Sequence, residues 1–303
     1  MNAAPALLGY AAAVGFLAPR LLLRSAWPQR APTLAVAVWL ALSASFTMAI
    51  ALATYQLIAP TEHLHVGLTG LLHSCGLTTA TAVSGPTIAS HLEVALPGSV
   101  VLVVLGGLAF EVLRGLRARS RHRKILDVVG RRSPRLRATV LEHDLPAAYC
   151  LPGRRPRVVV SAGAVRLLST EQLDAVLEHE RAHITGRHHL ALAASAAFAR
   201  IFGRLPLARH AREQTAVLLE MIADDRALRH QPREVLAAAM YEMAAGTAPV
   251  GAFSVGGPTA LIRLRRILTP QQRPHAALRG SVAAAAATVP LVPLLMSCAH
   301  AIG

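Results

Sequence analysis

The stretch STEQLDAVLEHERAHITG, residues 169–186, decides the fold that we expect for this chain. Ser169 or Thr170 is a suitable helix N-cap, and apolar residues recur after it with helical spacing. Gly186 offers a stop at the other end, because glycine commonly terminates helices. Together these signals predict a helix of roughly 14 to 16 residues.

Residues 179–183 of this helix read His-Glu-Arg-Ala-His. Because positions i and i+4 lie on one helix face, His179 and His183 can offer two imidazole nitrogens to one tetrahedral zinc ion. Glu180 lies beside them, close enough to accept a proton from water at the metal. This is the H-E-x-x-H pattern of zinc-dependent peptidases, and it predicts a zinc metalloendopeptidase with one Zn²⁺ per chain.

A second predicted helix carries two carboxylates that can complete the metal site. Residues 220–224 read Glu-Met-Ile-Ala-Asp, so Glu220 and Asp224 share a helix face. Since a catalytic zinc usually takes three protein ligands, we expect Glu220 to be the third. We expect Asp224 to orient a histidine through its other ring nitrogen, with Asp225 as the alternative for that role. Ordinary solvated carboxylates are the alternative for the pair as a whole.

Four stretches are long and apolar enough to cross a membrane as helices: residues 3–23, 33–59, 96–116 and 280–302. The first could instead be a cleaved signal peptide, but no positively charged region precedes its apolar run, so we expect a span. Residues 190–207 are too short for a span, and we expect a helix that is buried or lies at the membrane interface. The sequence therefore predicts a multi-pass α+β membrane protein that contacts the lipid bilayer.

The basic residues indicate an orientation in the cell membrane. Of the 31 Lys and Arg residues, three lie before position 114, one at the end of the first predicted span and two between the first two spans, and the loop 60–95 has none. Basic loops stay in the cytoplasm. We therefore expect the N-terminus, the 60–95 loop and the C-terminus outside, and residues 114–279 in the cytoplasm.

Three domains follow from this topology. Residues 1–116 are expected to hold three transmembrane helices and the outer loop. Residues 117–279 are expected to form a cytoplasmic, mostly helical zinc metallopeptidase domain with a small sheet. Residues 280–303 are expected to form a C-terminal transmembrane helix.

Two short β-branched runs flanked by turn residues predict strands of the small sheet, at residues 138–141 and at Val158, Val159 and Val160. Zinc peptidases hold the backbone of a substrate by adding it to an edge strand. We expect Val158–Val160 to be that substrate-binding edge strand. An ordinary core strand is an alternative of nearly equal weight.

These motifs resemble those of the gluzincin membrane peptidases. Within that group the chain most resembles metallopeptidase family fifty-six, whose best-known members are the BlaR/MecR beta-lactam sensor-transducers. Besides the two zinc motifs, the resemblance rests on residues 148–153, 157–161, 186–189 and 263–268. It covers residues 95–303, and it extends to the CaaX prenyl protease and HtpX groups, which share the zinc residues.

The resemblance implies signal-controlled proteolysis of a cytoplasmic or membrane protein, for example a transcriptional repressor. The chain ends at Gly303 and has no S-x-x-K motif, so we expect it to lack the outer penicillin-binding sensor domain of the BlaR/MecR proteins. Two alternatives stay open. One is an HtpX-like quality-control peptidase for membrane proteins, and the other is a catalytically silent membrane transducer.

The formal net charge of +15 would also suit a nucleic-acid-binding protein. However, aromatic residues make up only 4% of the chain, and no helix-turn-helix pattern stands out. The basic runs 114–124 and 131–137 directly follow the third predicted span. We therefore expect no direct nucleic-acid binding, and we interpret these runs as topology determinants that can rest against anionic lipid headgroups.

Other polar residues carry weaker expectations. We expect His188 and His189 to be surface or interface residues, and we consider Arg226 or His230 as donors to the oxyanion of a peptidase reaction. Cys75 and the histidines of the outer loop have metal-ligand types without metal-ligand spacing. Three cysteines in all predict no disulfide framework.

Overall fold

The structure is a computed structural model that describes residues 3–58, 88–247, 257–269 and 274–302. Within these ranges the chain is mostly helical and carries one small sheet. The predicted outer loop, residues 60–95, lies largely outside the described residues, as does Cys75.

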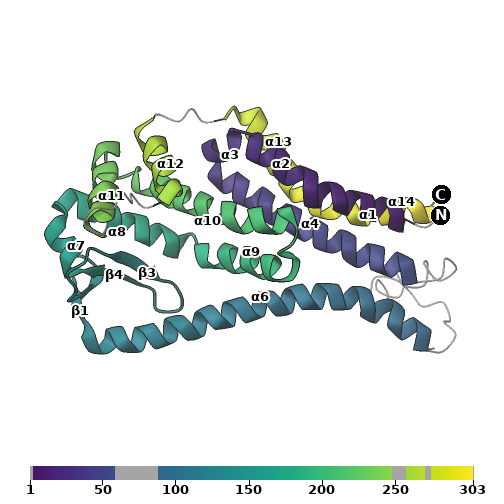
Figure 1. Cartoon of the computed structure of the whole chain (residues 1–303), viewed down its shortest axis with the longest axis horizontal. Helices are drawn as coiled ribbons and strands as arrows, with labels where there is room; N and C mark the ends of the chain where they lie inside the picture. The colour runs from purple at the N-terminus through teal and green to yellow at the C-terminus, as the bar shows by residue number, and fades with distance from the viewer. Residues whose placement is uncertain (1–2, 59–87, 248–256, 270–273, 303) are drawn as a thin grey trace.

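Most of the longer helices run side by side along the long axis of the molecule, whereas α11 and α12 run across it (Figure 1). In chain order they are α1 (Ala4–Ala12), η1 (Ala13–Leu17), α2 (Ala18–Arg24), α3 (Trp27–Arg30), α4 (Pro32–Ile58), α6 (Ile88–Val129), α7 (Ala162–Leu167), α8 (Thr170–Thr185), α9 (His188–Phe202), α10 (Pro206–Ala227), α11 (Arg233–Thr247), α12 (Gly257–Leu268), α13 (Ala276–Thr288), η3 (Val289–Leu291) and α14 (Val292–Ile302). The α1–α2 and α13–α14 segments lie on one side, α6 lies on the other, and α4, α9 and α10 lie between them.

Four of the described helical segments have the length and composition to cross a membrane: Ala4–Arg24, Pro32–Leu57, Ala95–Val129 and Ala276–Cys298. They coincide with the four predicted spans and suggest a multi-pass membrane protein. The third is longer than predicted, because α6 continues as a helix through the basic residues to Val129. The orientation of the spans stays a prediction.

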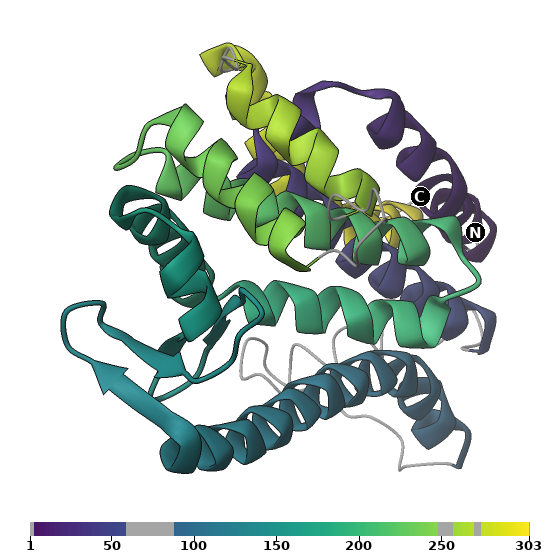
Figure 2. The ribbon, with the colours of Figure 1, turned by 60° about the vertical axis from the view of Figure 1, so that its left-hand side comes forward.

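Helices α9 and α10 form a hairpin that lies between α4 and α6 (Figures 1 and 2). Phe46 of α4 packs edge-on against Phe198 and Phe202 of α9, with ring centroids 6.0 and 5.3 Å apart. On the other side, the buried carboxylate of Glu111 in α6 accepts a hydrogen bond from Nε of Arg200 in α9 at 2.8 Å. The arginine-bearing apolar stretch is thus a helix packed among other helices, one of the two placements that the sequence left open.

The largest hydrophobic cluster joins candidate membrane helices to α10. Trp39 and Phe46 of α4 share this cluster with Leu218 and Met221 of α10, and all four side chains are buried. Leu218 lies two residues before Glu220 and Met221 directly follows it, so a candidate span supports the helix that carries a predicted zinc ligand.

The sheet of the described residues has four strands: β1 (Gly130–Ser133), β2 (Ala138–Leu141), β3 (Ala148–Leu151) and β4 (Arg157–Ser161). Their order is β1-β2-β4-β3, with β2 and β4 parallel and the other pairs antiparallel. The strands at 138–141 and 158–160 are confirmed, while β1 and β3 were not predicted. Neither β1, with its glycine and two arginines, nor the four-residue β3 has a strong β-branched pattern.

The prediction that Val158, Val159 and Val160 form an edge strand is wrong. The strand β4 is hydrogen-bonded to β2 on one side and to β3 on the other. Its three valines are buried, as in a central strand, and the continuous apolar run reflects burial on both faces. The edge strands of this sheet are β1 and β3.

Candidate metal centre

The helix α8 forms where the sequence predicts it. The Oγ of Ser169 accepts a hydrogen bond from the backbone N–H of Gln172 at 3.3 Å, and the side chain of Gln172 accepts one from the N–H of Ser169 at 2.9 Å. This reciprocal capping box starts the helix, and Gly186 is its C-cap. Leu173 and Leu177 pack in a cluster with the strands. That packing fixes the rotation of α8 and sets the direction of its remaining side chains.

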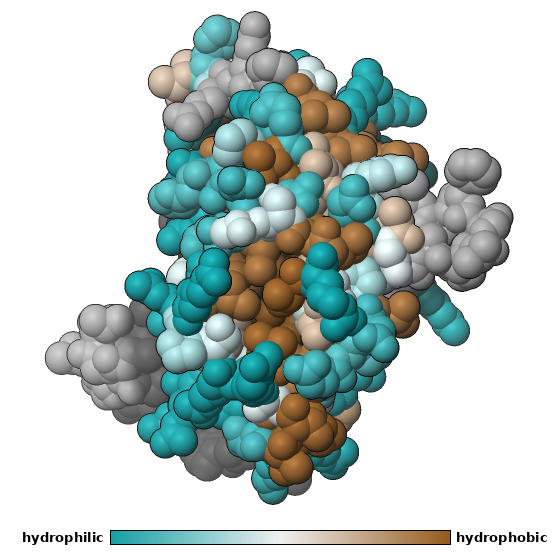
Figure 3. Space-filling view, turned by 90° about the vertical axis from the view of Figure 1, so that its left-hand side faces the viewer, coloured by the Kyte–Doolittle hydropathy of each residue, from teal (hydrophilic) through white to brown (hydrophobic). Residues whose placement is uncertain are grey.

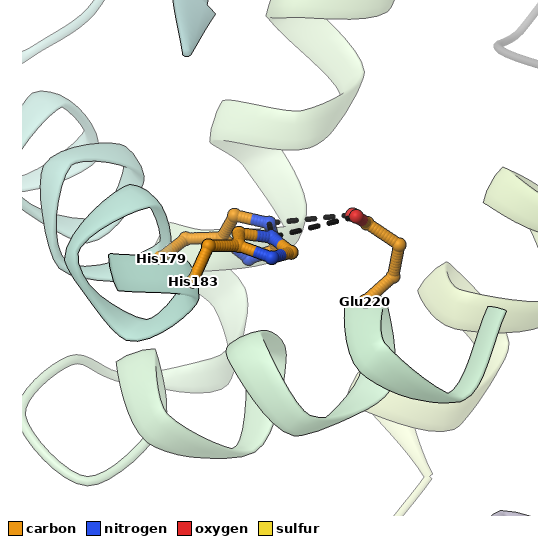
Figure 4. A group of neighbouring side chains, drawn as sticks. All are labelled: His179, His183 and Glu220. Atoms are coloured by element: carbon orange, nitrogen blue, oxygen red, sulfur yellow. Dashed lines mark hydrogen bonds and ion pairs between the residues drawn. The ribbon is translucent and has the colours of Figure 1, made fainter. Parts of the chain in front are cut away.

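His179 and His183 of α8 point toward Glu220 of α10 (Figure 4). Each histidine places its Nε2 atom 3.4 Å from a different oxygen of the Glu220 carboxylate. The two Nε2 atoms are 3.2 Å apart. One ligand atom from each of the three residues lies within 4.8 Å of the others, an arrangement that could hold a metal ion. The structure thus brings together the three residues that the sequence selected as ligands.

Asp224, one helical turn after Glu220, lies behind His179. Its Oδ1 is 3.0 Å from Nδ1 of His179, and its side chain is 1% exposed. A carboxylate in this position holds the imidazole in the tautomer that leaves Nε2 free for a metal. The sequence placed Asp224, rather than Asp225, in this position, and the geometry agrees.

His188 holds the second histidine in a similar way. Its Nδ1 is 2.8 Å from Nδ1 of His183, and its residue is buried. Burial, reinforced by the neighbouring His183, lowers the pKa of His188 to about 4, so its imidazole is neutral and can accept a hydrogen bond. The prediction that His188 is a surface or interface residue is wrong, because its side chain is buried against His183. Arg187 adopts a left-handed backbone conformation, with φ of 50°, which turns the chain back so that His188 faces the site.

Arg263 of α12 is the site residue that sequence reasoning missed. Its Nε and Nη2 donate to the two oxygens of Asp224 at 2.8 and 2.7 Å, and its Nη1 lies 2.9 Å from Glu220. Arg226 and His230, the residues considered as oxyanion donors, are exposed at and beyond the end of α10. The only signal in the sequence was a run of arginines 39 residues after Asp224, and its spacing cannot reveal which helix it contacts.

The neighbouring carboxylate, Asp225, points to a different partner. Arg266 of α12 binds it with two hydrogen bonds, at 2.7 and 2.9 Å, and donates through Nε to the backbone carbonyl of Gln29 at 2.8 Å. Gln29 lies in α3, the short connection between the first two candidate spans. The metal centre is therefore tied, through α12, to the point where two candidate membrane helices are joined.

Glu180 lies between the ligand cluster and the edge strand β3. It shares a side-chain hydrogen bond with Cys150 of β3, and its pKa is raised, chiefly by burial. Burial also raises the pKa of Cys150 to about 12, so its thiol keeps its proton and can donate to the Glu180 carboxylate. Hence β3, rather than β4, is the strand beside the predicted catalytic glutamate.

The charges of the buried groups suit a cation. Burial opposes ionisation of Asp224, but the hydrogen bond from Arg263 outweighs it and holds the pKa of Asp224 at about 2. Burial likewise opposes ionisation of Glu220, and the contact with His179 lowers its pKa below the usual range. Both carboxylates are therefore anionic near neutral pH.

The donor set fits zinc. Two imidazoles and one carboxylate are a ligand set of catalytic zinc sites, which leave a fourth position for water. The second ring nitrogen of each histidine already has a partner, in Asp224 and His188. Such supporting contacts are the usual companions of zinc-binding histidines.

A comparison with protein-family models finds one match in the region of these motifs. Residues 115–249 match the model of peptidase family M48. The match to this zinc metallopeptidase family covers less than half of the chain and contains His179, Glu180, His183 and Glu220. It gives no support to the closer resemblance with the BlaR/MecR type. No curated protein and no solved structure matches the chain.

Proposed function

We propose that this protein is a membrane-anchored, zinc-dependent endopeptidase that cleaves polypeptide segments at the membrane surface. The observation that carries the proposal is the cluster of His179, His183 and Glu220, in which Asp224 and His188 hold the outer nitrogens of the histidines. The M48 match agrees with this chemistry. The described candidate spans agree with a membrane anchor.

Glu180 is the general base and acid of the proposed reaction. Zinc bound by the three ligands would polarise the scissile carbonyl and lower the pKa of water toward neutrality. Glu180 accepts the proton of the attacking water and returns it to the leaving amine. Its partly buried position and raised pKa suit this shuttle, since a proton carrier works best when its pKa lies near the working pH.

The free edge of β3 is the proposed binding site for the substrate backbone. This strand pairs only with β4 within the described sheet, and its Cys150 contacts Glu180. A substrate segment added to this edge would lie next to the catalytic glutamate, and backbone hydrogen bonds would hold it in extended form. Binding through backbone hydrogen bonds depends little on the side chains of the substrate, so it suits a peptidase that cleaves many substrates.

The family match favours an HtpX-like role in quality control of membrane proteins over cleavage of a single transcriptional repressor. The link from Arg266 to Gln29 supports this reading, because it places the metal centre near the connection between two candidate spans. A survey of cleavage products in cells that make active or Glu180→Gln protein separates the two roles. Many membrane proteins cut near their spans would support quality control, whereas one soluble target would support the repressor.

Metal content and proteolysis of the detergent-purified full-length protein test the proposed chemistry. We expect about one zinc per chain in the wild type and in Glu180→Gln, but strong depletion in Glu220→Ala, because only the latter removes a ligand. Cleavage of an unfolded substrate should be lost in both variants. Glu213→Ala is the matched control, since Glu213 is an exposed glutamate two turns earlier on α10, and it should keep both zinc and activity. A wild type without zinc under metal-replete conditions contradicts the proposal.

A further inference from the structure

A hollow of about 700 Å³ lies where the sheet meets the C-terminal end of α8, apart from the ligand cluster. Its wall includes the end of β1, the start of β2, the start of β4 and the last turns of α8. The charged lining residues are all arginines: Arg132, Arg137, Arg155, Arg157 and Arg181. No carboxylate is among the lining residues, so the hollow is strongly positive.

Three of these arginines have no anionic partner. Arg157 pairs with Asp127 at 2.6 Å, and Arg181 pairs with Glu178 at 2.6 Å. The other three arginines of the lining are Arg132, Arg137 and Arg155, and all three are exposed. In the described part of the chain, no carboxylate lies within ion-pair distance of them. Guanidinium groups bind carboxylates through paired hydrogen bonds, so this hollow suits a ligand with several negative charges.

The hollow is within reach of a substrate held along β3. Leu151, the last residue of β3, pairs with Arg157, and the loop between them carries Arg154 and Arg155. A strand added to the free edge of β3 would lie two strand spacings, about 10 Å, from β4. An extended chain covers this distance in about three residues. The part of the substrate that passes the Leu151 end of β3 therefore reaches the arginines.

Other anionic ligands fit the hollow less well. After the apolar stretch 94–110 of α6, charged residues resume at Glu111 and Arg114, and the helix then runs for 15 further residues to Val129, about 22 Å, before β1 begins. On the predicted topology the membrane surface lies near Arg114, and this distance exceeds the Debye length of about 8 Å, so lipid headgroups would lie too far away. In this respect the proposal departs from the expectation that residues 131–137 rest against anionic headgroups. The lining has no aromatic side chain on which a nucleic-acid base could stack.

We propose that the arginine-lined hollow binds an acidic segment of the protein substrate, a few residues beyond the segment held on β3. This inference rests on the proposed peptidase function and adds a preference to it. The edge of β3 holds any extended backbone, whereas the hollow favours substrates with clustered Asp and Glu on one side of the cleavage site.

Binding of labelled peptides to the full-length Glu180→Gln protein in neutral detergent tests the proposal without requiring cleavage. The peptides share an apolar, β-forming centre, and they carry four glutamates before it, four glutamates after it, or glutamines in both places. We expect one of the two acidic peptides to bind roughly tenfold more tightly than the glutamine peptide, because only one direction reaches the hollow. The triple change Arg132→Gln, Arg137→Gln and Arg155→Gln should abolish this preference.

A control triple separates the hollow from the general positive charge of the chain. The changes Arg166→Gln, Arg212→Gln and Arg229→Gln remove the same charge from exposed sites elsewhere, and they should leave the preference unchanged. Equal weakening by both triples, or equal binding of all three peptides, overturns the proposal. The proposal is also overturned if the protein binds anionic lipid vesicles and the Arg132, Arg137 and Arg155 triple abolishes that binding but leaves peptide binding intact. Zinc content of the wild type, measured in parallel, reports separately on the peptidase function.

Discussion

At the scale of single residues, two adjacent carboxylates have different partners. Asp224 is buried between His179 and Arg263, whereas Asp225 is half-buried and binds Arg266. Successive helix positions differ by about 100° in direction. Asp224 therefore faces the metal centre, whereas Asp225 points away from the metal centre toward Arg266 of α12. The chemistry of the two side chains is the same, and only their direction distinguishes them.

Asp224→Asn should therefore weaken zinc binding by about 10- to 100-fold, because the charge that supports His179 is lost while the shape is kept. The matched change Asp225→Asn leaves His179 untouched and should keep the wild-type affinity. Competition with a chelator of known affinity, applied to purified protein, measures both. Equal loss in the two variants would mean that Asp224 acts through the fold rather than through the histidine.

The pH dependence of the metal-free protein follows from the same contact. Burial opposes protonation of His179, but Asp224 and Glu220 outweigh it and raise its pKa to about 9 from 6.5. The pKa of His179 is thus higher in the folded state than in the unfolded state. The protonated imidazole therefore stabilises the fold fully below about pH 6.5, and this stabilisation is lost as the pH rises through about 9. It amounts to at most about 3 kcal/mol. The Tm of chelator-treated protein should fall over this range.

A histidine change checks that assignment. The fall in Tm should be absent in His179→Gln and present in His230→Gln, in which an exposed histidine is removed. A fall of the same size in both variants would assign the effect to another group.

At the scale of elements, α12 joins the metal centre to the connection between the first two candidate spans. On one of its faces, Arg263 binds Asp224 of α10 and Arg266 binds Asp225, and Arg266 also donates to Gln29 of α3.

Arg263→Gln leaves the buried Asp224 without its arginine partner, which typically costs about 3–5 kcal/mol of stability. The exposed neighbour Arg265 is the matched control, and Arg265→Gln should change the free energy of unfolding by less than about 0.5 kcal/mol. Chemical denaturation in detergent compares them, and equal stabilities contradict this role of α12.

At the scale of the whole molecule, the largest hydrophobic cluster of the described residues crosses the boundary between candidate membrane helices and the region of the M48 match. Trp39, 2% exposed, lies in that cluster with Met221, which directly follows the predicted ligand Glu220. Trp39→Ala should lower stability by about 3–5 kcal/mol and reduce zinc occupancy, since α10 loses its support. Leu57→Ala on the same helix removes a side chain that is 64% exposed and should do neither. Full zinc binding by an isolated fragment 117–279 would show that this support is dispensable.

The sequence by itself determined the features that depend on neighbours along the chain. Helix α8, its caps and the positions of His179, Glu180 and His183 follow from a period of 3.6 residues and from local hydrogen bonds. The four apolar helices follow from length and composition. The choice of Glu220 and Asp224 also rested on helical spacing. The two helices were connected in that prediction because a catalytic zinc ion usually takes three protein ligands.

Only the tertiary structure decided which distant segments meet. The run Val158–Val160 reads the same in an edge strand and in a central strand, and strand order alone placed it inside the sheet. His188 became a partner of His183 because the chain reverses at Arg187, and Arg263 reached Asp224 because α12 packs against α10. These contacts depend on how several helices pack at once, and packing between elements leaves no fixed spacing in the sequence.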